Sequence, residues 1–259
     1  MRKTLSSAAT IVFGLALLAV PTTAIAQTPV PPNWSFTGAY AGLNLGAVQN
    51  IDRGTYSCYL GSVKYGIGCV LPNFGNIHAE GFLGGATLGY NWQIDRLVLG
   101  VEADYDGSSL SGGVAYSGIM AEVGGSLSGK FSASEGLSWL STERLRLGFV
   151  TSPGSMVFLT GGAAQGEWQL QSDISSPGFG FTGGYPDVTQ ATRSGWAEGI
   201  GYETALAPRV SFKVDVMSYE LQPFETNVGP SGTPYYGYTA GKDFYFHGST
   251  ARIGLNWKL

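Results

Sequence analysis

The chain has few of the residues on which most enzymes and nucleic-acid-binding proteins depend. Its 259 residues include only 14 Lys and Arg, two His and two Cys. The formal net charge is −4 and no basic cluster occurs, which argues against nucleic acid as a partner. We find no nucleophile elbow, run of metal ligands or glycine-rich phosphate loop in a supporting context, so the sequence predicts neither catalysis nor a cofactor.

Long hydrophobic runs are also missing beyond the first 26 residues. Arg2 and Lys3 precede an apolar run over residues 8–20, and small residues at 24–26 provide a cleavage site. We therefore expect residues 1–26 to be a cleaved signal peptide, followed by a short periplasmic lead-in over residues 27–36. No later stretch approaches the roughly 18–20 apolar residues of a transmembrane helix, so any later membrane span must consist of strands.

Eight short segments of alternating apolar and polar residues are present instead. The connections between them are alternately long and short, and the long ones cover residues 49–80, 107–136, 167–193 and 221–243. This layout is typical of an up-and-down barrel with short periplasmic turns and long extracellular loops. The sequence thus predicts an all-β, eight-stranded antiparallel transmembrane β-barrel over residues 37–259, in the bacterial outer membrane.

Aromatic residues support a membrane location. Side chains alternate between the two faces of a strand, and one face is apolar in every segment except the fifth, at about residues 156–165, which is too rich in Gly, Ala and Thr for its faces to be assigned. On that face Phe82 and Trp92 are ten residues apart, as are Trp139 and Phe149. In a tilted strand ten residues span about 25 Å, the expected height of the apolar band between two aromatic girdles. Outer-membrane lipid is therefore a predicted partner.

The opposite face of the segments carries charges of both signs. An eight-stranded barrel has a lumen only wide enough for side chains, so these charges should neutralise one another in a closed interior. An ion-selective constriction is the alternative. The predicted lumenal ion pairs involve Glu102, Asp104, Arg144, Arg146, Glu203, Lys213, Asp215 and Arg252.

Glu143 breaks the pattern, because it falls on the apolar, lipid-facing side of its segment. The opposite register would expose Arg144 and Arg146 to lipid at about 2–4 kcal/mol each, so the assignment stands. Two interpretations follow: a local bulge or a carboxylate that reaches the membrane interface, or a lipid-face contact with a second protein.

The long connections hold the remaining candidates. Cys58 and Cys69 share one connection, and in an exported protein they are expected to form a disulfide, with two free thiols as the alternative. The connections are rich in Gly, Ser, Tyr and Phe, which suits either recognition of an unknown extracellular ligand or simple closure of the barrel mouth. His247, four residues after Asp243, leaves an outer-membrane hydrolase or acyltransferase as a minor alternative.

Several short motifs resemble one known family. Residues 84–93, 98–104, 145–148 and 252–258 are similar, in order and spacing, to the small outer-membrane β-barrel family of alphaproteobacteria, the porin-like surface-antigen group. The resemblance implies an integral barrel inserted by the barrel-assembly machinery, with roles in envelope integrity and host recognition. Some relatives bind haem-type ligands. Relatives usually end in an aromatic residue, so an ending on Leu259 implies slower assembly.

These observations predict a non-enzymatic barrel that contributes to envelope integrity and to surface recognition through its extracellular loops. The alternative is a narrow pore or an outer-membrane barrel that binds a small, haem-type ligand.

Overall fold

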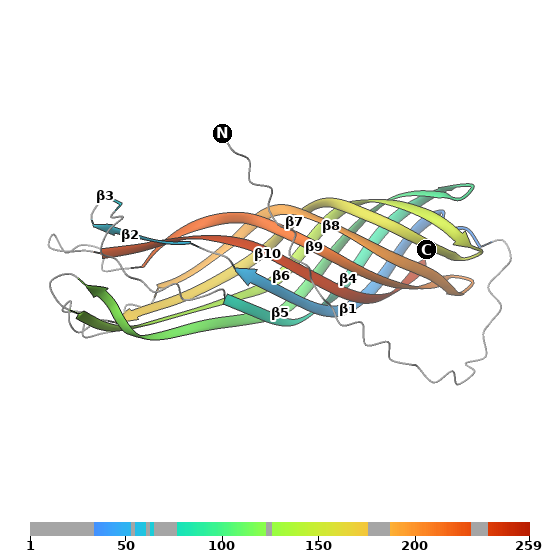
Figure 1. Ribbon diagram of the computed structural model, residues 1–259. Coiled ribbons are helices and arrows are strands. Elements are labelled where there is room, and N and C mark those ends of the chain that lie inside the picture. Colours follow the sequence, from blue (N-terminus) through green and yellow to red (C-terminus); the bar gives the residue numbers. More distant parts are fainter. Residues whose placement is uncertain are drawn as a thin grey trace, which may run out of the picture.

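The computed structural model describes residues 34–52, 55–60, 63–64, 77–122, 126–175, 187–228 and 238–259, and every regular element in these ranges is a strand (Figure 1). None of the described residues belongs to a helix that is long and apolar enough to cross a membrane. The predicted signal peptide lies outside the described residues. The strands are β1 (Gly38–Asp52), β2 (Thr55–Leu60), β3 (Val63–Lys64), β4 (Ile77–Ile94), β5 (Leu97–Glu122), β6 (Ser126–Ser152), β7 (Ser155–Ser175), β8 (Asp187–Ala207), β9 (Val210–Val228) and β10 (Tyr238–Lys258).

Eight of these strands close into a ring. The order β1-β4-β5-β6-β7-β8-β9-β10 is antiparallel throughout, and β1 also pairs with β10, from Tyr40 opposite Lys258 to Asn50 opposite Gly248. Strand β2 pairs with the outer part of β10, and β3 pairs with β2. The predicted eight-stranded up-and-down barrel is confirmed, and closure leaves no free sheet edge in the membrane-spanning part.

The strands are longer than the alternating segments of the sequence. Strands β5 and β6 comprise 26 and 27 residues and extend through most of the predicted connection 107–136. They continue because inward residues there still bury apolar surface: Leu110, Ala133 and Leu137 are all buried. The barrel wall therefore continues well beyond the aromatic residues that mark the lipid boundary.

A β-bulge in β6 changes which residues face inward. The register of β6 shifts by one residue between Leu137 and Trp139 against β7. Below the bulge even-numbered residues such as Leu140 and Thr142 are buried, whereas above it Glu135 and Leu137 are buried. One extra residue thus reverses the facing of the outer half of the strand.

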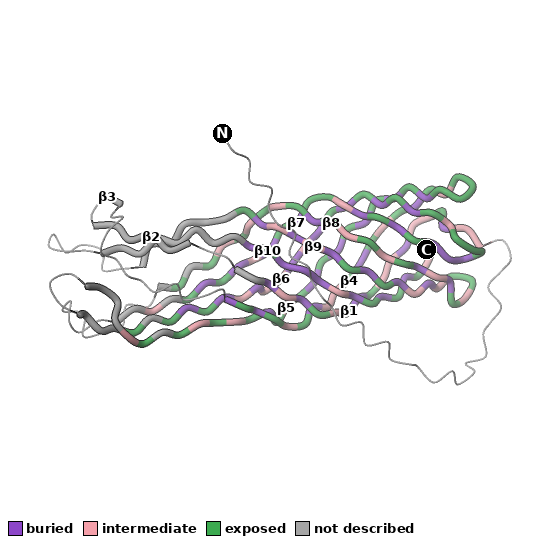
Figure 2. The backbone as a smooth tube through the Cα atoms, viewed as in Figure 1, coloured by how far each residue is buried: buried purple, intermediate pink, exposed green. Residues whose placement is uncertain are grey.

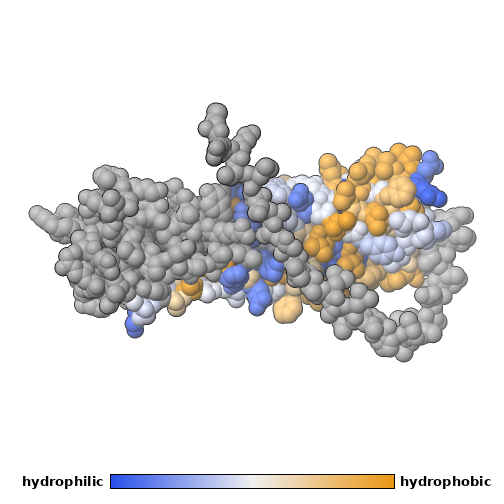
Figure 3. Space-filling model, viewed as in Figure 1, coloured by the Kyte–Doolittle hydropathy of each residue, from blue (hydrophilic) through white to orange (hydrophobic). Residues whose placement is uncertain are grey.

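The outer wall is apolar over the half of the barrel that ends in the short turns (Figure 3). Buried and exposed residues alternate along the strands (Figure 2), with Leu43 72% exposed and Leu88 62% exposed. In β7, whose faces the sequence pattern left unassigned, Val157 and Leu159 face outward and Phe158 faces inward.

Two apolar clusters fill the lumen at different heights. Near the end with the short turns, Phe36, just before β1, packs with Val98, Met156 and Phe158. The backbone N–H of Phe36 donates to Gln93 Oε1 at 2.8 Å, which holds this residue in the mouth of the barrel. Toward the other end a larger cluster includes Leu137, Trp168, Leu170, Tyr219, Leu221 and Phe246. Charged residues lie between the two clusters.

Candidate functional site: the lumenal charge network

Nine charged side chains occupy the middle of the lumen, and all are buried. They come from five strands, at every second position, because alternate residues of a strand point to the same face. Strand β5 contributes Glu102, Asp104 and Asp106; β6 contributes Arg144 and Arg146; β8 contributes Glu203; β9 contributes Lys213 and Asp215; and β10 contributes Arg252.

Glu102 lies at the centre of one half of the network. Its carboxylate accepts hydrogen bonds from Arg144 Nη2 at 2.7 Å and from Lys213 Nζ at 3.1 Å. Arg146 Nη1 is 3.3 Å away, and the hydroxyl of Tyr40 donates to Oε2 at 2.8 Å. Three cations and one hydroxyl therefore surround a single carboxylate that is 3% exposed.

Arg252 organises the other half. Its Nε donates to Asp215 Oδ1 at 2.9 Å and its Nη1 donates to Asp106 Oδ2 at 2.9 Å. Its Nη2 lies 3.5 Å from Asp104 Oδ2. Asp104 also pairs with Arg144, so it joins the two halves. A guanidinium has five N–H donors in a plane, which lets one Arg hold three carboxylates.

Arg146 links the network to the apolar cluster around Phe36. Its Nη2 donates to Glu203 Oε2 at 2.8 Å, and its guanidinium lies 4.0 Å from the centroid of the Phe158 ring. Ser211 and Asn256 donate to the other oxygen of Glu203, at 2.5 and 3.1 Å. Charged and aromatic layers therefore pack directly against each other.

The structure brings together all eight residues proposed as lumenal ion pairs. It adds Tyr40 and Asp106, which are absent from the predicted ion pairs. The signal for both was parity, since Tyr40 and Asp106 alternate with the apolar residues of their segments. Five acidic and four basic groups leave one excess negative charge in the network.

The charges of the network compensate one another. Each charge of the network has an opposite charge within hydrogen-bonding or ion-pair distance, as required when charges are removed from water. Apolar clusters lie on both sides of it along the barrel axis, one around Phe36 and one around Trp168. The described part of the chain thus contains side chains at three successive levels of the lumen.

Glu143 lies where the sequence placed it, exposed on the outer wall of β6. Its register neighbours are Ala103 on β5 and Ala163 on β7, and Ser141 Oγ donates to its Oε1 at 3.3 Å. No bulge occurs at this position, since the β6 register is unbroken from Trp139 to Val150. A local bulge is therefore wrong as an explanation. A carboxylate that reaches the membrane interface and a contact with a second protein both remain.

The remaining candidates are scattered. Cys58 lies in β2, but Cys69 lies outside the described residues, so the disulfide stays a prediction. His247 Nδ1 is 3.4 Å from Glu220 Oε2 on the exposed outer wall, whereas the side chain of Asp243 lies outside the described part. Among the described residues no group of three or more His, Cys, Asp and Glu could hold a metal ion.

A closed eight-stranded barrel with an apolar outer wall and a charged, filled lumen defines an integral protein of the bacterial outer membrane. The chain belongs to the outer membrane protein beta-barrel domain family, whose model matches residues 11–258. Its relatives place it among the small barrels of alphaproteobacteria.

Two relatives illustrate this placement. The 31 kDa outer-membrane immunogenic protein of Brucella melitensis is 29% identical over 236 residues, which are 90% of this chain and 88% of the relative. The 22 kDa outer membrane protein of Rhizobium leguminosarum is 32% identical over 61% of this chain and 58% of its own length. Among solved structures, the outer membrane protein OprG from Pseudomonas aeruginosa is 12% identical, covers 87% of this chain and 99% of that chain, and has a TM-score of 0.47.

Proposed function

We propose that this protein is a non-enzymatic, non-conducting barrel that stabilises the outer membrane and presents its extracellular segments to external partners. The observation that carries the proposal is the filled lumen, in which the Glu102 and Arg252 centres lie between two apolar clusters. A lumen of this kind supports the fold and leaves the surface beyond the membrane for recognition. Insertion by the barrel-assembly machinery is part of the same proposal.

The projecting wall supports a surface role. Strand β5 continues for 17 residues after Tyr105, and its partner β6 runs beside it. At about 3.3 Å per residue this hairpin extends tens of ångströms beyond the aromatic boundary. Relatives that carry the name immunogenic protein are consistent with exposure at the cell surface.

The test separates the role of the membrane-spanning barrel from that of the outer β5–β6 hairpin, which is called the projection below. A strain that lacks the gene is complemented with the full chain or with a variant in which residues 115–132 are replaced by Asn-Gly. Val114 and Ala133 are opposite each other in the register, so the shortened hairpin can close. Both proteins should restore survival in detergent with EDTA, and only the full chain should restore adhesion of the cells to immobilised extracellular-matrix protein.

Two results would contradict the proposal. If the full chain does not improve survival, the envelope role is wrong. If the shortened hairpin adheres as well as the full chain, recognition does not depend on the projection. For both proteins, different migration of boiled and unboiled samples on a gel establishes that the barrel is folded.

The narrow pore is the competing function, and conductance separates it from the plug. Purified wild-type protein in planar bilayers should give no discrete openings, because charged and apolar layers block the lumen in series. Reproducible openings would show that the plug is mobile and would favour the pore.

A further inference from the structure

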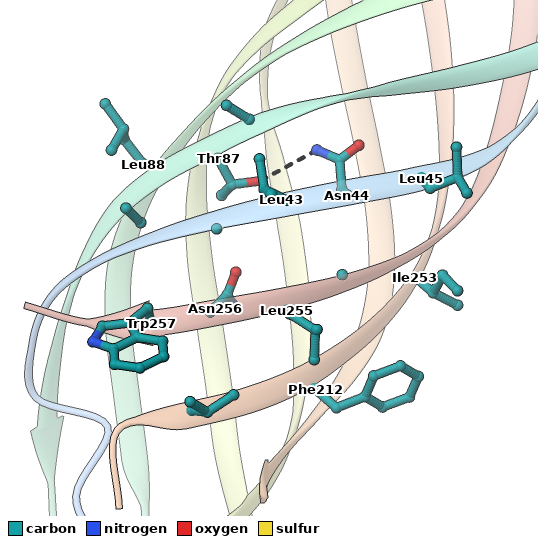
Figure 4. Close-up of a pocket in the computed structure, with 15 residues that line it drawn as sticks. Leu43, Asn44, Leu45, Thr87, Leu88, Phe212, Ile253, Leu255, Asn256 and Trp257 are labelled. Atoms are coloured by element: carbon teal, nitrogen blue, oxygen red, sulfur yellow. Dashed lines mark hydrogen bonds between the residues drawn. The ribbon is translucent and has the colours of Figure 1, made fainter. Parts of the chain in front are cut away.

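An apolar trough crosses the outer wall where the barrel closes. It lies across β9, β10, β1 and β4 and has a volume of about 870 Å³, within the range of roughly 300–1,000 Å³ found for sites that hold small ligands (Figure 4). Large apolar side chains border it: Leu43, Leu45, Leu88, Phe212, Ile253, Leu255 and Trp257.

Small residues produce the hollow. Ala41 lies between Trp257 and Leu88 in the register, and Ala86 lies between Leu43 and Tyr105. At each position a methyl group stands between two bulky side chains. Three polar residues, Asn44, Thr87 and Asn256, are part of the lining, but their side chains are buried, and Asn44 Nδ2 donates to Thr87 Oγ1 at 3.3 Å (Figure 4). The floor is therefore apolar.

An arginine directly precedes the residue that lines the periplasmic end of the trough. Val210 lines this end, and the preceding residue, Arg209, belongs to the short turn between β8 and β9. The carbonyl of Arg209 accepts a hydrogen bond from the Lys258 backbone N–H at 2.8 Å, which fixes the turn against β10 beside Trp257. Arg209 is exposed and forms no ion pair with any residue of the described part of the chain.

We infer that the trough binds one glycerophospholipid of the periplasmic leaflet, with an acyl chain along Ala41 and Ala86 and the phosphate at Arg209. The apolar lining matches a hydrocarbon chain, and a guanidinium is suited to bind phosphate through paired hydrogen bonds. The indole of Trp257 lies at the same end, where aromatic side chains occupy the headgroup level. Short turns mark the periplasmic side of such barrels, so the charge faces the phospholipid leaflet rather than the outer one.

The experiment measures lipid retained by the purified full chain. Protein reconstituted with phosphatidylethanolamine and phosphatidylglycerol at 3:1 is transferred to detergent and examined by native mass spectrometry. Wild-type protein should keep one phospholipid per barrel. Arg209→Gln removes the phosphate contact and Ala86→Phe fills the trough, and each should reduce the retained fraction at least fivefold.

Matched controls lie elsewhere on the same wall. Arg96→Gln changes the turn between β4 and β5. Like the carbonyl of Arg209, the carbonyl of Arg96 accepts a hydrogen bond from a backbone N–H, that of Val150, at 2.8 Å. Ala163→Phe adds an outward phenyl group on β7. Both controls should retain lipid like the wild type, and all variants are first shown to fold by unboiled gel migration.

Three outcomes would overturn the inference. Equal retention by wild type, Arg209→Gln and Ala86→Phe would show that the trough holds no specific lipid. Loss from the controls to the same extent would show general annular binding. Preferential retention of lipid A, when it is added in competition, would assign the trough to the other leaflet.

Discussion

Glu102 illustrates how a single lumenal residue constrains its neighbours. Arg144, Arg146 and Lys213 were removed from water when the barrel formed, and each lies within 3.3 Å of this one carboxylate. Buried ion pairs add little net stability, but removal of one partner leaves uncompensated buried charge. The effect of a substitution here should therefore exceed that of an equal change on the surface.

The first prediction concerns neutralisation of this carboxylate. Glu102→Gln keeps the shape of the side chain but leaves three cations with less opposite charge, so the free energy of unfolding should fall by about 3–5 kcal/mol. Urea titration of the protein in lipid vesicles, followed by tryptophan fluorescence, measures the change. Glu80→Gln, on the exposed wall of β4, is the control and should change stability by less than about 0.5 kcal/mol. Equal effects at the two sites would show that the network is not the source.

The second prediction concerns the charge on the lipid face. Glu143 has Ser141 as a hydrogen-bond donor, and its register neighbours on both adjacent strands are alanines, which provide no opposite charge. Transfer of its carboxylate into lipid is therefore unfavourable. Glu143→Leu should stabilise the barrel in bilayers, by less than about 2 kcal/mol, and raise the temperature at which it unfolds on heated gels. Glu167→Leu, farther along the wall, serves for comparison. A loss of cross-linked partners from membranes of the variant would instead favour the protein-contact interpretation.

At the scale of strands, glycines in β4 make room for lumenal side chains. The ring of Tyr40 covers Gly89, where a Cβ atom would lie 2.3 Å from both Cζ and the hydroxyl oxygen. That hydroxyl donates to Glu102 and accepts from Arg146. Because Gly89 has no side chain, the Tyr40 ring can lie where these two hydrogen bonds form. The position of the Tyr40 ring thus depends on a residue without a side chain.

The third prediction tests this packing of Tyr40 on Gly89. Gly89→Ala should displace Tyr40 from the network and destabilise the barrel by about 1–3 kcal/mol, as expected for overpacking. Gly107→Ala on β5 is the matched control, because its nearest contact would be an ordinary 3.9 Å. Urea midpoints in vesicles compare the two. Similar midpoints for both variants would show that Tyr40 can move at no cost.

The existence of the eight barrel strands, and the facing of their membrane-spanning residues except in β7, followed from the sequence, because alternation is a local property that survives without knowledge of the neighbours. The outer half of β6 did not follow. Its bulge at Leu137–Trp139 reverses the facing, so continued alternation from Thr142 would have placed Glu135 on the wrong side. A bulge depends on pairing with β5 and β7, which one segment alone does not encode.

The length of the strands and the geometry of the charge network could also not be predicted from the local sequence pattern. Serine and glycine dominate the outward face of outer β5, so this region has the composition of a loop, yet Leu110 and Val114 pack inward and extend the sheet. In the lumen, parity predicted which charges point inward, but not that Arg252 would span Asp215 and Asp106. That contact joins strands that are distant in the chain and depends on the barrel's shear.

At the scale of the whole molecule, three layers of side chains lie in series along the lumen, and the proposed function requires that they block it. Phe36 belongs to the apolar cluster near the short turns, Arg146 to the charge network and Trp168 to the cluster at the other end. Since water and ions must pass all three, the most resistive layer sets the current. A single opened layer should leave the total conductance unchanged.

The fourth prediction follows from this arrangement. Phe36→Ala, Arg146→Gln and Trp168→Leu each loosen one layer, and each single variant should stay silent in planar bilayers and in liposome-swelling assays with small sugars. The triple variant should give discrete openings, because a hydrated path then runs the length of the barrel. Folding of every variant is checked by gel migration before boiling. If Arg146→Gln alone conducts, the charge network is the only seal, and the apolar clusters act in stability rather than in closure.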